Sequence, residues 1–251
     1  MERWVVAARA EQGAASPYWG SLLHGMLMER LPSQWQERLH GDGLRPFSQW
    51  VEAGAGGAFV WRLNALDDDL AAAVEPHIFE GQRWHCRHLQ SDLIFERVAR
   101  ERLSIQAYMK PFFLAETAAP RLRLSFLTTT THRTQGGYAL FPSVELIAGA
   151  LRDRLCALEP TFVLSDDEAL EQLVARTRIV RYRLQSGSFA LEKARVQGYT
   201  GHVDLNIQGP DALIRLADAL FSFAPWCGVG IKTALGMGGC TVETIEYGRK
   251  K

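Results

Sequence analysis

The sequence predicts an α+β protein built from two consecutive ferredoxin-like units, each with the element order β-α-β-β-α-β. Segments in which apolar and polar residues alternate occur in both halves, and this pattern is typical of half-buried strands. Apolar stripes at helical spacing lie between these segments. The 251 residues, 47% of them hydrophobic, suffice for one large domain or two small ones. We expect an N-terminal domain over residues 1–115 and a C-terminal domain over residues 116–251.

The first half begins with a predicted strand over residues 3–9. Ser16 followed by Pro17 is a combination typical of a helix start, with serine as the N-cap. The helix then carries an apolar stripe made of Trp19, Leu22, Leu23, Met26 and Leu27. The remaining predicted elements of this half are strands at 46–51 and 58–63, a short helix at 67–74 and a strand at 83–87. The stretch 91–116 predicts one or two further helices.

The second half repeats the same order with one additional helix. Its predicted strands alternate clearly, and the two in the middle pair as a hairpin around a loop that carries Lys193 and Arg195. The predicted elements are strand 121–126, helices 145–158 and 166–176, strands 179–184 and 199–207, helix 213–220 and strand 240–245.

Composition limits the classes of function. Lys and Arg together number 28, as do Asp and Glu, so nucleic-acid binding would have to rest on a local basic patch. The four cysteines show no CxxC pair and no metal-ligand spacing, which indicates reduced, buried thiols in a cytoplasmic protein. The chain opens directly into a strand-like segment, and no apolar run reaches the ~18 residues of a membrane helix.

A glycine-rich segment near the end of the sequence is its most unusual feature. Between Gly228 and Gly239 it holds five glycines around the pair Lys232-Thr233. Exposed backbone N–H groups and a lysine favour anion binding, whereas the alternative is a plain turn before the last strand. Walker and dinucleotide loops are excluded by the glycine spacing, and both also need a preceding strand and a following helix.

The order helix, G-h-G-x-K-T-A-L-G-M-G, final strand resembles the glycine-rich loop of RAMP proteins of CRISPR systems, and among them the Cas6 endoribonucleases. The stretch from Arg121 to Pro142, with F-L-T-T-T followed by F-P, is similar to the family's F-L-T-P-T and F-P segments, with threonine in place of proline. The resemblance spans most of the chain. It implies tandem ferredoxin-like domains and a cofactor-free, metal-independent endoribonuclease that cleaves CRISPR precursor RNA within its repeats.

The resemblance also implies three catalytic residues. The family places one on the first helix, a histidine before the second strand and a basic residue near that strand's start, which here are His24, His40 and Arg45. Family members often have tyrosine in place of His24 and lysine in place of Arg45. Two histidines can act as base and acid near neutral pH, and an arginine can stabilise the phosphorane. The reaction would leave a 2′,3′-cyclic phosphate and a 5′-hydroxyl.

The other five histidines predict no catalytic role. His85 and His88 are three residues apart on a predicted strand and would point to opposite faces, so we predict no metal site. His132 lies in a threonine-rich stretch, where nothing in the sequence supports a contact with RNA. The remaining two, His77 and His202, fit a helix end and an exposed strand face.

Basic residues around the predicted hairpin favour binding of RNA phosphates, although a solvated sheet face is the alternative. The expected RNA-binding residues are Arg181, Arg183, Lys193, Arg195, Gly228, Gly230, Lys232, Thr233, Gly236 and Gly238. The expected partner is CRISPR repeat RNA; a homodimer and contacts with other CRISPR-associated proteins of an interference complex stay open. Two rival functions remain, namely a non-catalytic RAMP subunit that binds guide RNA and a small-molecule enzyme with a ferredoxin-like core.

Overall fold

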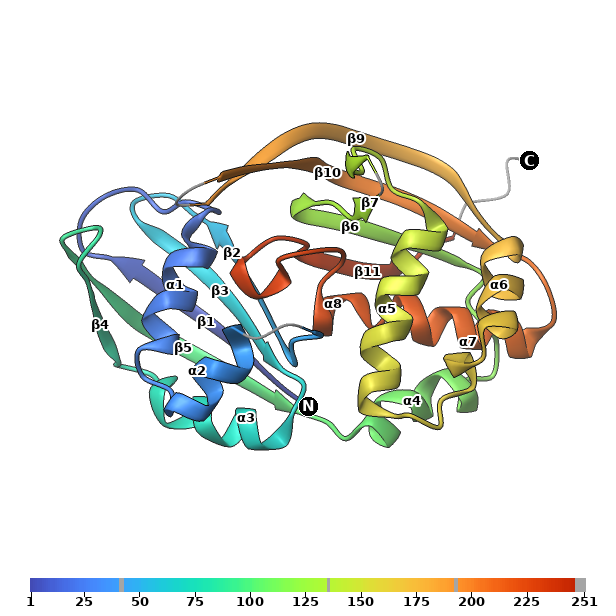
Figure 1. Ribbon diagram of the computed structural model, residues 1–251, viewed down its shortest axis with the longest axis horizontal. Coiled ribbons are helices and arrows are strands. Elements are labelled where there is room, and N and C mark those ends of the chain that lie inside the picture. The colour runs from blue at the N-terminus through green and yellow to red at the C-terminus, as the bar shows by residue number, and fades with distance from the viewer. Residues whose placement is uncertain (41–42, 135, 192–193, 247–251) are drawn as a thin grey trace.

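The computed structural model describes residues 1–40, 43–134, 136–191 and 194–246, and it contains one large antiparallel sheet from each half of the chain (Figure 1). The first sheet has the order β2-β3-β1-β5-β4 and consists of β1 (Glu2–Ala10), β2 (Phe47–Ala53), β3 (Ala58–Ala65), β4 (Arg83–Cys86) and β5 (Ser91–Arg102). The second has the order β11-β6-β10-β9 and consists of β6 (Arg121–Thr130), β9 (Thr177–Leu191), β10 (Ala194–Ile207) and β11 (Cys240–Thr244). The short strands β7 (Arg133–Thr134) and β8 (Gly137–Tyr138) pair separately.

Helices connect these strands in the predicted alternation. They are α1 (Trp19–Met28), α2 (Ser33–His40), α3 (Asp68–Val74), α4 (Ile105–Leu114), α5 (Val144–Leu158), α6 (Asp167–Arg176), α7 (Asp211–Phe221) and α8 (Ala224–Cys227). No helix within the described ranges is long and apolar enough to cross a lipid bilayer. Each sheet contains the strand order fourth-first-third-second of a β-α-β-β-α-β unit, so the α+β, tandem ferredoxin-like prediction is confirmed.

The predicted helix over the first part of 91–116 is wrong, because Ser91–Arg102 forms β5 beside the central strand β1. Its apolar residues do alternate, with Leu93 and Phe95 fully buried. Charged residues fill its second half and hide this alternation in the sequence. One of them, Glu101, pairs across the sheet with Arg3 at 3.6 Å. The fourth strand of the first unit is therefore β5, and the predicted strand β4 is an additional edge strand; α4 agrees with the rest of the prediction.

Two local predictions in the first half also need correction. The N-cap of α1 is Tyr18 rather than Ser16, because the Trp19 N–H donates to the Ser16 carbonyl at 3.0 Å and closes a turn before the helix. No helix was predicted between the first helix and β2, but α2 occupies Ser33–His40. Trp35 and Leu39 are four residues apart and both buried, which is the helical spacing that the prediction missed.

Two large apolar clusters support the sheets. In the first half, Trp61 and Trp84 meet edge to face with ring centroids 5.6 Å apart, and Phe95 lies 5.0 Å from Trp84. In the second half, the helices α5 and α7 cover the sheet through residues such as Leu151 and Leu220. Packing in these clusters fixes the positions of α1 and α5, which lie on the two sides of the glycine-rich segment.

The hairpin of β9 and β10 is much longer than predicted and reaches from the second sheet toward the first half (Figure 1). Near its end the ring of Phe189 packs edge to face against Tyr18, with centroids 5.3 Å apart. The Tyr18 hydroxyl donates a hydrogen bond to the Ser188 carbonyl at 3.3 Å. The hairpin thus contacts the chain at the start of α1.

Candidate active site between the two halves

The glycine-rich segment follows α8 and runs to β11, and we call residues 228–239 the glycine loop. Gly228, Gly230, Gly236 and Gly238 have φ angles of 71°, 84°, 102° and 71°. L-residues rarely adopt this region, so glycine is needed at these turns. Lys232 also adopts a left-handed conformation, with φ 55°, and starts a 3₁₀ turn.

The missing side chains of these glycines leave room for neighbouring backbone. A Cβ atom on Gly230 would collide with the Thr131 carbonyl oxygen, and one on Gly238 would collide with the Val229 carbonyl oxygen. The loop is therefore folded tightly on itself and on the end of β6. This packing accounts for the glycines, and their predicted contact with RNA stays a prediction.

The glycine loop is also fixed against the first half of the chain. A Cβ on Gly20 of α1 would lie 2.6 Å from the Gly236 Cα, so the two backbones are in direct contact. The buried Gln49 side chain donates to the carbonyl oxygens of Gly20 and Ala234, both at 2.7 Å. The glycine loop therefore fills the space beside Gly20, whereas apart from α1 itself no described atom lies within 4 Å of a Cβ on Gly25.

The three predicted catalytic residues belong to neighbouring elements. His24 on α1 is buried, and its ring centroid lies 5.9 Å from that of Phe47, the first residue of β2. Two residues before Phe47, Arg45 donates through Nε to the carbonyl oxygen of Leu39 at 2.6 Å. His40 follows Leu39 as the last residue of α2, and its side chain lies outside what the structure describes.

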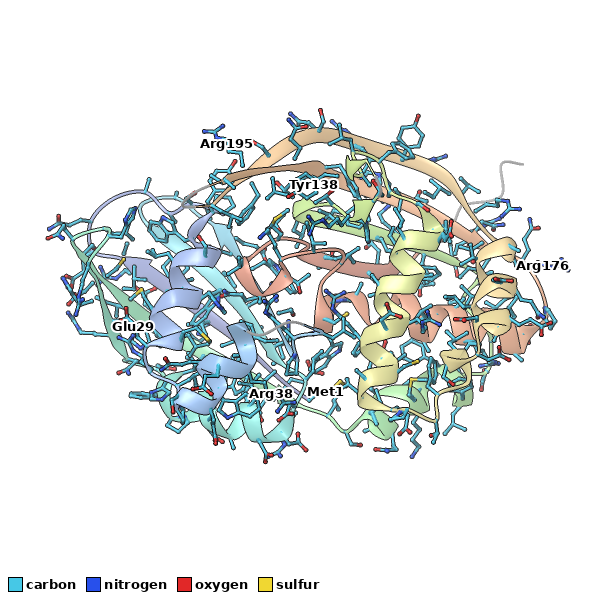
Figure 2. All side chains as sticks on the ribbon, in the orientation of Figure 1. Met1, Glu29, Arg38, Tyr138, Arg176 and Arg195 are labelled. Carbon is cyan, nitrogen blue, oxygen red and sulfur yellow. The ribbon has the colours of Figure 1, made fainter. Side chains whose placement is uncertain are left out.

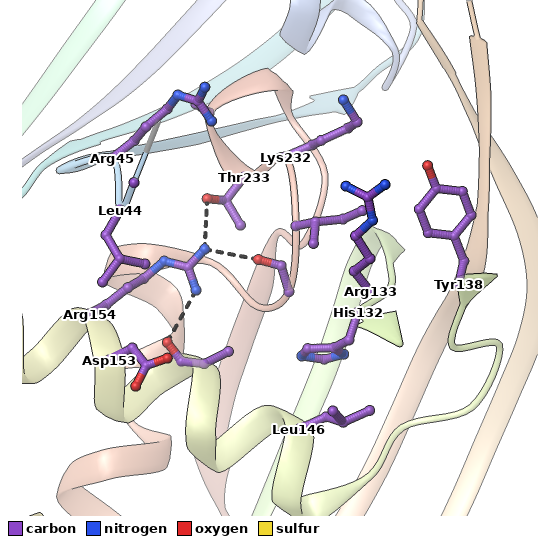
Figure 3. A pocket seen from close by; sticks show the side chains of 15 residues that line it. Leu44, Arg45, His132, Arg133, Tyr138, Leu146, Asp153, Arg154, Lys232 and Thr233 are labelled. Atoms are coloured by element: carbon purple, nitrogen blue, oxygen red, sulfur yellow. Dashed lines mark hydrogen bonds between the residues drawn. The ribbon is translucent and has the colours of Figure 1, made fainter. Parts of the chain in front are cut away.

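A cavity of about 520 Å³ opens between α5, the glycine loop and the segment that enters β2 (Figure 3). It joins the predicted catalytic Arg45 with three predicted RNA-binding residues of the loop, Gly230, Lys232 and Thr233. His24 is not among the described residues that line it. The lining residues are Gly43, Leu44, Arg45, His132, Arg133, Tyr138, Leu146, Ala150, Asp153, Arg154, Gly230, Ile231, Lys232, Thr233 and Ala234.

Arg154 of α5 is a cavity residue that no motif in the sequence singled out. Its guanidinium donates to the Gly230 carbonyl oxygen at 2.9 Å and to the Thr233 hydroxyl at 3.4 Å (Figure 3). It also donates to the Ala150 carbonyl oxygen one helical turn earlier, at 3.3 Å. The arginine therefore holds the glycine loop against α5 and places a permanent positive charge in the cavity wall.

His132 is the second cavity residue to which the sequence assigned no role. Its side chain is only 5% exposed, and neither ring nitrogen has a hydrogen-bond partner among the described residues. Burial, together with the positive charge of Arg154, lowers the pKa of His132 from 6.5 to about 4. The imidazole is therefore neutral near pH 7.

The hairpin arginines do not line this cavity. Arg181 and Arg183 share one face of β9, and Arg181 lies opposite Asp204, which accepts two hydrogen bonds from Arg123 at 2.7 and 2.9 Å. Arg195 lies near the far end of the hairpin, opposite Ala190 (Figure 2). At about 3.3 Å per residue, Arg183 and Ala190 are roughly 23 Å apart along β9.

The predicted basic residues are thus spread along the hairpin instead of forming one compact patch. Lys193 lies outside the described residues. The outer face of β9 and the cavity are two separate places at which the structure puts predicted RNA-binding residues.

The described residues near the cavity are poorly suited to catalysis by a cysteine nucleophile or by a bound metal ion. Cys227 and Cys240 flank the glycine loop in the sequence as free, buried thiols, and burial raises the pKa of Cys227 to about 12, so this thiol stays protonated. Over the part of the chain that the structure describes, no group of three or more His, Cys, Asp or Glu side chains is placed to hold a metal ion.

Comparisons with known proteins agree with the resemblance of the motifs. A family model described as CRISPR-associated endoribonuclease Cas6 matches residues 124–240, which include most of β6 and the whole glycine loop. A protein with the same name from Streptococcus thermophilus is 28% identical over 220 residues, or 88% of this chain and 89% of that protein. A namesake from Mycobacterium tuberculosis strain H37Rv is 26% identical over 234 residues, or 90% of this chain and 72% of that protein.

Solved structures establish the fold in the same way. A Thermus thermophilus Cas6 superposes with a TM-score of 0.72 at 23% identity, covering 96% of this chain and 98% of that one. A Cas6 product complex gives a TM-score of 0.77 at 24% identity, covering 97% and 100%. The family model, the relatives over nearly the whole chain and the tandem fold thus agree in their similarity to the Cas6 family of CRISPR-associated endoribonucleases.

Proposed function

We propose that this protein cuts CRISPR precursor RNA within its repeats, without a metal ion, and that the scissile phosphate binds at the cavity between the two halves. The observation that carries the proposal is the meeting of Arg45, next to the end of α2, with Lys232 of the glycine loop in one cavity. Arg133 and Arg154 add two further positive charges to the lining, against one carboxylate from Asp153. Phosphate binding thus gains a local basic site in a chain whose net charge is zero.

The proposed reaction uses the RNA's own 2′-hydroxyl as nucleophile. One histidine of the pair His24 and His40 takes the hydroxyl proton, and O2′ forms a bond to the adjacent phosphorus. The bond from phosphorus to O5′ breaks, and the other histidine gives its proton to O5′. The products are a 2′,3′-cyclic phosphate and a 5′-hydroxyl, and the charge on the phosphorane is balanced by Arg45.

The experiment compares two repeat RNAs from the CRISPR array adjacent to the gene, each incubated with the protein in excess EDTA. One is all ribose, and the other carries a single 2′-deoxy nucleotide just upstream of the mapped cleavage site. We expect the ribose RNA to be cut at full rate to a cyclic phosphate. The deoxy RNA should bind with equal affinity and stay whole.

Two outcomes would contradict this mechanism, namely loss of cleavage in EDTA or normal cleavage of the deoxy RNA. A His40→Ala variant tests the residue assignment and should cut about a hundredfold more slowly or worse with unchanged RNA affinity. His88→Ala is its matched control, because His88 is exposed in the turn between β4 and β5.

A non-catalytic subunit that only holds guide RNA would bind the repeat RNA and leave it intact under all these conditions, so the same assay separates the two functions. A homodimer and contacts with other CRISPR-associated proteins stay predictions. We place the protein in the cytoplasm, because its four cysteines are unpaired.

A further inference from the structure

The buried imidazole of His132 is a polar group that the proposed reaction does not use. It lines the cavity on the side away from Arg45, close to Arg133 and Leu146 (Figure 3). Both ring nitrogens are buried and have no hydrogen-bond partner within the described ranges. Buried polar groups in folded proteins nearly always have partners, so a partner from outside the chain is a physical explanation for this arrangement.

The backbone holds His132 rigidly in its position. Its carbonyl oxygen accepts a hydrogen bond from the Ala139 N–H at 3.0 Å, and the Thr131 hydroxyl donates to the Ala139 carbonyl oxygen at 2.9 Å. The Thr131 carbonyl oxygen also accepts from the Ile231 N–H of the glycine loop at 3.0 Å. These hydrogen bonds fix the backbone at His132, and the imidazole in its neutral form offers one donor and one acceptor.

The surroundings of His132 combine three chemical features. The Tyr138 ring stands at the rim, on the strand that pairs with β7, directly opposite Arg133. Arg133 and Lys232 are exposed cations of the same lining. An aromatic ring, a paired donor and acceptor, and cations at the rim together match the base and the phosphate of one nucleotide, and a volume of about 520 Å³ is in the range of small-ligand sites.

We propose that this cavity receives one unpaired nucleotide of the repeat RNA, with its base against His132 and its phosphate near Arg133 and Lys232, and that His132 helps to select the base. This inference rests on the proposed function, because it takes repeat RNA as the ligand. RNA-binding proteins commonly achieve sequence specificity by placing unstacked bases in such pockets. In this assignment His132 is a specificity-determining residue, separate from the catalytic histidines.

The test scans the repeat RNA with single abasic nucleotides at each unpaired position flanking the mapped cleavage site. Binding of each RNA is measured with the wild type and with His132→Phe, which fills the space but removes both hydrogen-bonding nitrogens. We expect His132→Phe to weaken binding of the intact RNA about 5- to 50-fold, as expected for one or two lost hydrogen bonds. One abasic position should weaken wild-type binding by a similar factor, and at that position alone His132→Phe should have no further effect.

A His132→Gln variant, which keeps a donor and an acceptor, should recover part of the affinity and still respond to that abasic position. His88→Phe, with an exposed histidine in the turn between β4 and β5, is the matched control and should leave all affinities unchanged. A merely structural role of His132 would lower the affinity for every RNA by the same factor, and this result would overturn the inference. So would unchanged binding by His132→Phe, or the absence of any sensitive abasic position.

The failure of the inference and the failure of the proposed function give different results. If the wild type cuts the intact repeat but shows no coupling between His132 and any position, only the nucleotide pocket is wrong. If the wild type neither binds nor cuts the repeat RNA, both proposals fall. If His132→Phe unfolds, His132→Gln and the wild-type abasic scan still decide.

Discussion

At the scale of single residues, Arg154 sets the electrostatics of the cavity. It is tied to the glycine loop by its hydrogen bonds to Gly230 and Thr233, so its charge cannot move away from His132. Burial of His132 and this fixed charge both disfavour the imidazolium form. The imidazole of His132 is therefore neutral at this position, and its protonation would destabilise the folded protein.

The first prediction concerns the pH dependence of stability. The pKa of His132 is about 4 in the folded protein, against an ordinary value of 6.5, so the unfolded chain binds the extra proton first as pH falls. The contribution of His132 is fully present above pH 6.5 and is lost as pH falls toward 4, by at most about 3 kcal/mol. His132→Phe should therefore flatten the curve of unfolding free energy against pH in this window. Urea unfolding at a series of pH values measures it.

The control for this prediction addresses the other charged groups at the cavity. Asp153 and Arg154 face it from α5, Arg133 follows β6, Arg45 precedes β2, and Lys232 belongs to the glycine loop. Asp153 supplies the one carboxylate among these five residues. Asp153→Asn should leave the slope between pH 6.5 and pH 4.5 nearly as in the wild type; equal slopes for the wild type and His132→Phe would refute the assignment.

At the scale of elements, α1 shows how two glycines in one helix serve different ends. Gly20 is in contact with the Gly236 backbone, while apart from α1 itself no described atom lies within 4 Å of the Cβ position of Gly25. Both residues lower intrinsic helix stability, since glycine is about 1 kcal/mol worse than alanine in a helix. Packing of the glycine loop on α1 explains why glycine occupies position 20, but it does not explain the glycine at position 25.

The second prediction compares these two sites. Gly20→Ala should lower the unfolding free energy by about 1 to 3 kcal/mol, because the new methyl group must push the glycine loop away. Gly25→Ala should leave it unchanged or raise it by up to about 1 kcal/mol. Guanidinium unfolding of both variants measures the difference. Similar effects of the two substitutions would mean that the close contact between α1 and the glycine loop is not rigid.

Most of the elements were predictable because each strand or helix has its own periodic pattern. One exception, β5, carries charges on its second half that pair with the neighbouring strand, and such pairing is not visible until the strands are placed side by side. The glycine loop was predictable from composition, but its contact with α1 was not. The sequence assigned no role to His132 or Arg154, because their surroundings depend on contacts with residues that are distant in the sequence, such as Gly230.

At the scale of the whole molecule, buried polar groups join the two halves. Gln49 accepts a hydrogen bond from the Trp61 indole N–H within the first half, and donates to the Ala234 carbonyl oxygen in the glycine loop. A second connection is made by Ser48, whose hydroxyl donates to the Trp226 carbonyl oxygen at 2.8 Å. Arg3 adds a third, with its guanidinium 3.9 Å from the Trp226 ring centroid. The division into domains 1–115 and 116–251 stays a prediction.

The third prediction tests the first of these connections. Gln49→Leu keeps an apolar side chain of similar size but leaves the Trp61 N–H and two carbonyl oxygens without their partner, so it should cost about 2 to 5 kcal/mol of unfolding free energy. The exposed Gln208 offers a matched control, and Gln208→Leu should change the unfolding free energy by less than about 0.5 kcal/mol. Urea unfolding followed by tryptophan fluorescence measures the stability of both variants. Equal stabilities of the two variants would show that the hydrogen bonds of Gln49 do not stabilise the contact between the two halves.

The contact between Gly20 and Gly236 has a consequence for synthesis on the ribosome. More than 200 residues separate the two glycines, so at about 5 to 20 residues per second α1 exists for at least roughly 10 s before its partner loop is made. During that interval the first sheet can form, but the cavity cannot, because Lys232, Thr233 and the backbone that Arg154 binds have not yet emerged. A nascent chain therefore cannot form this cavity, or bind RNA in it, until nearly all of the protein has been translated.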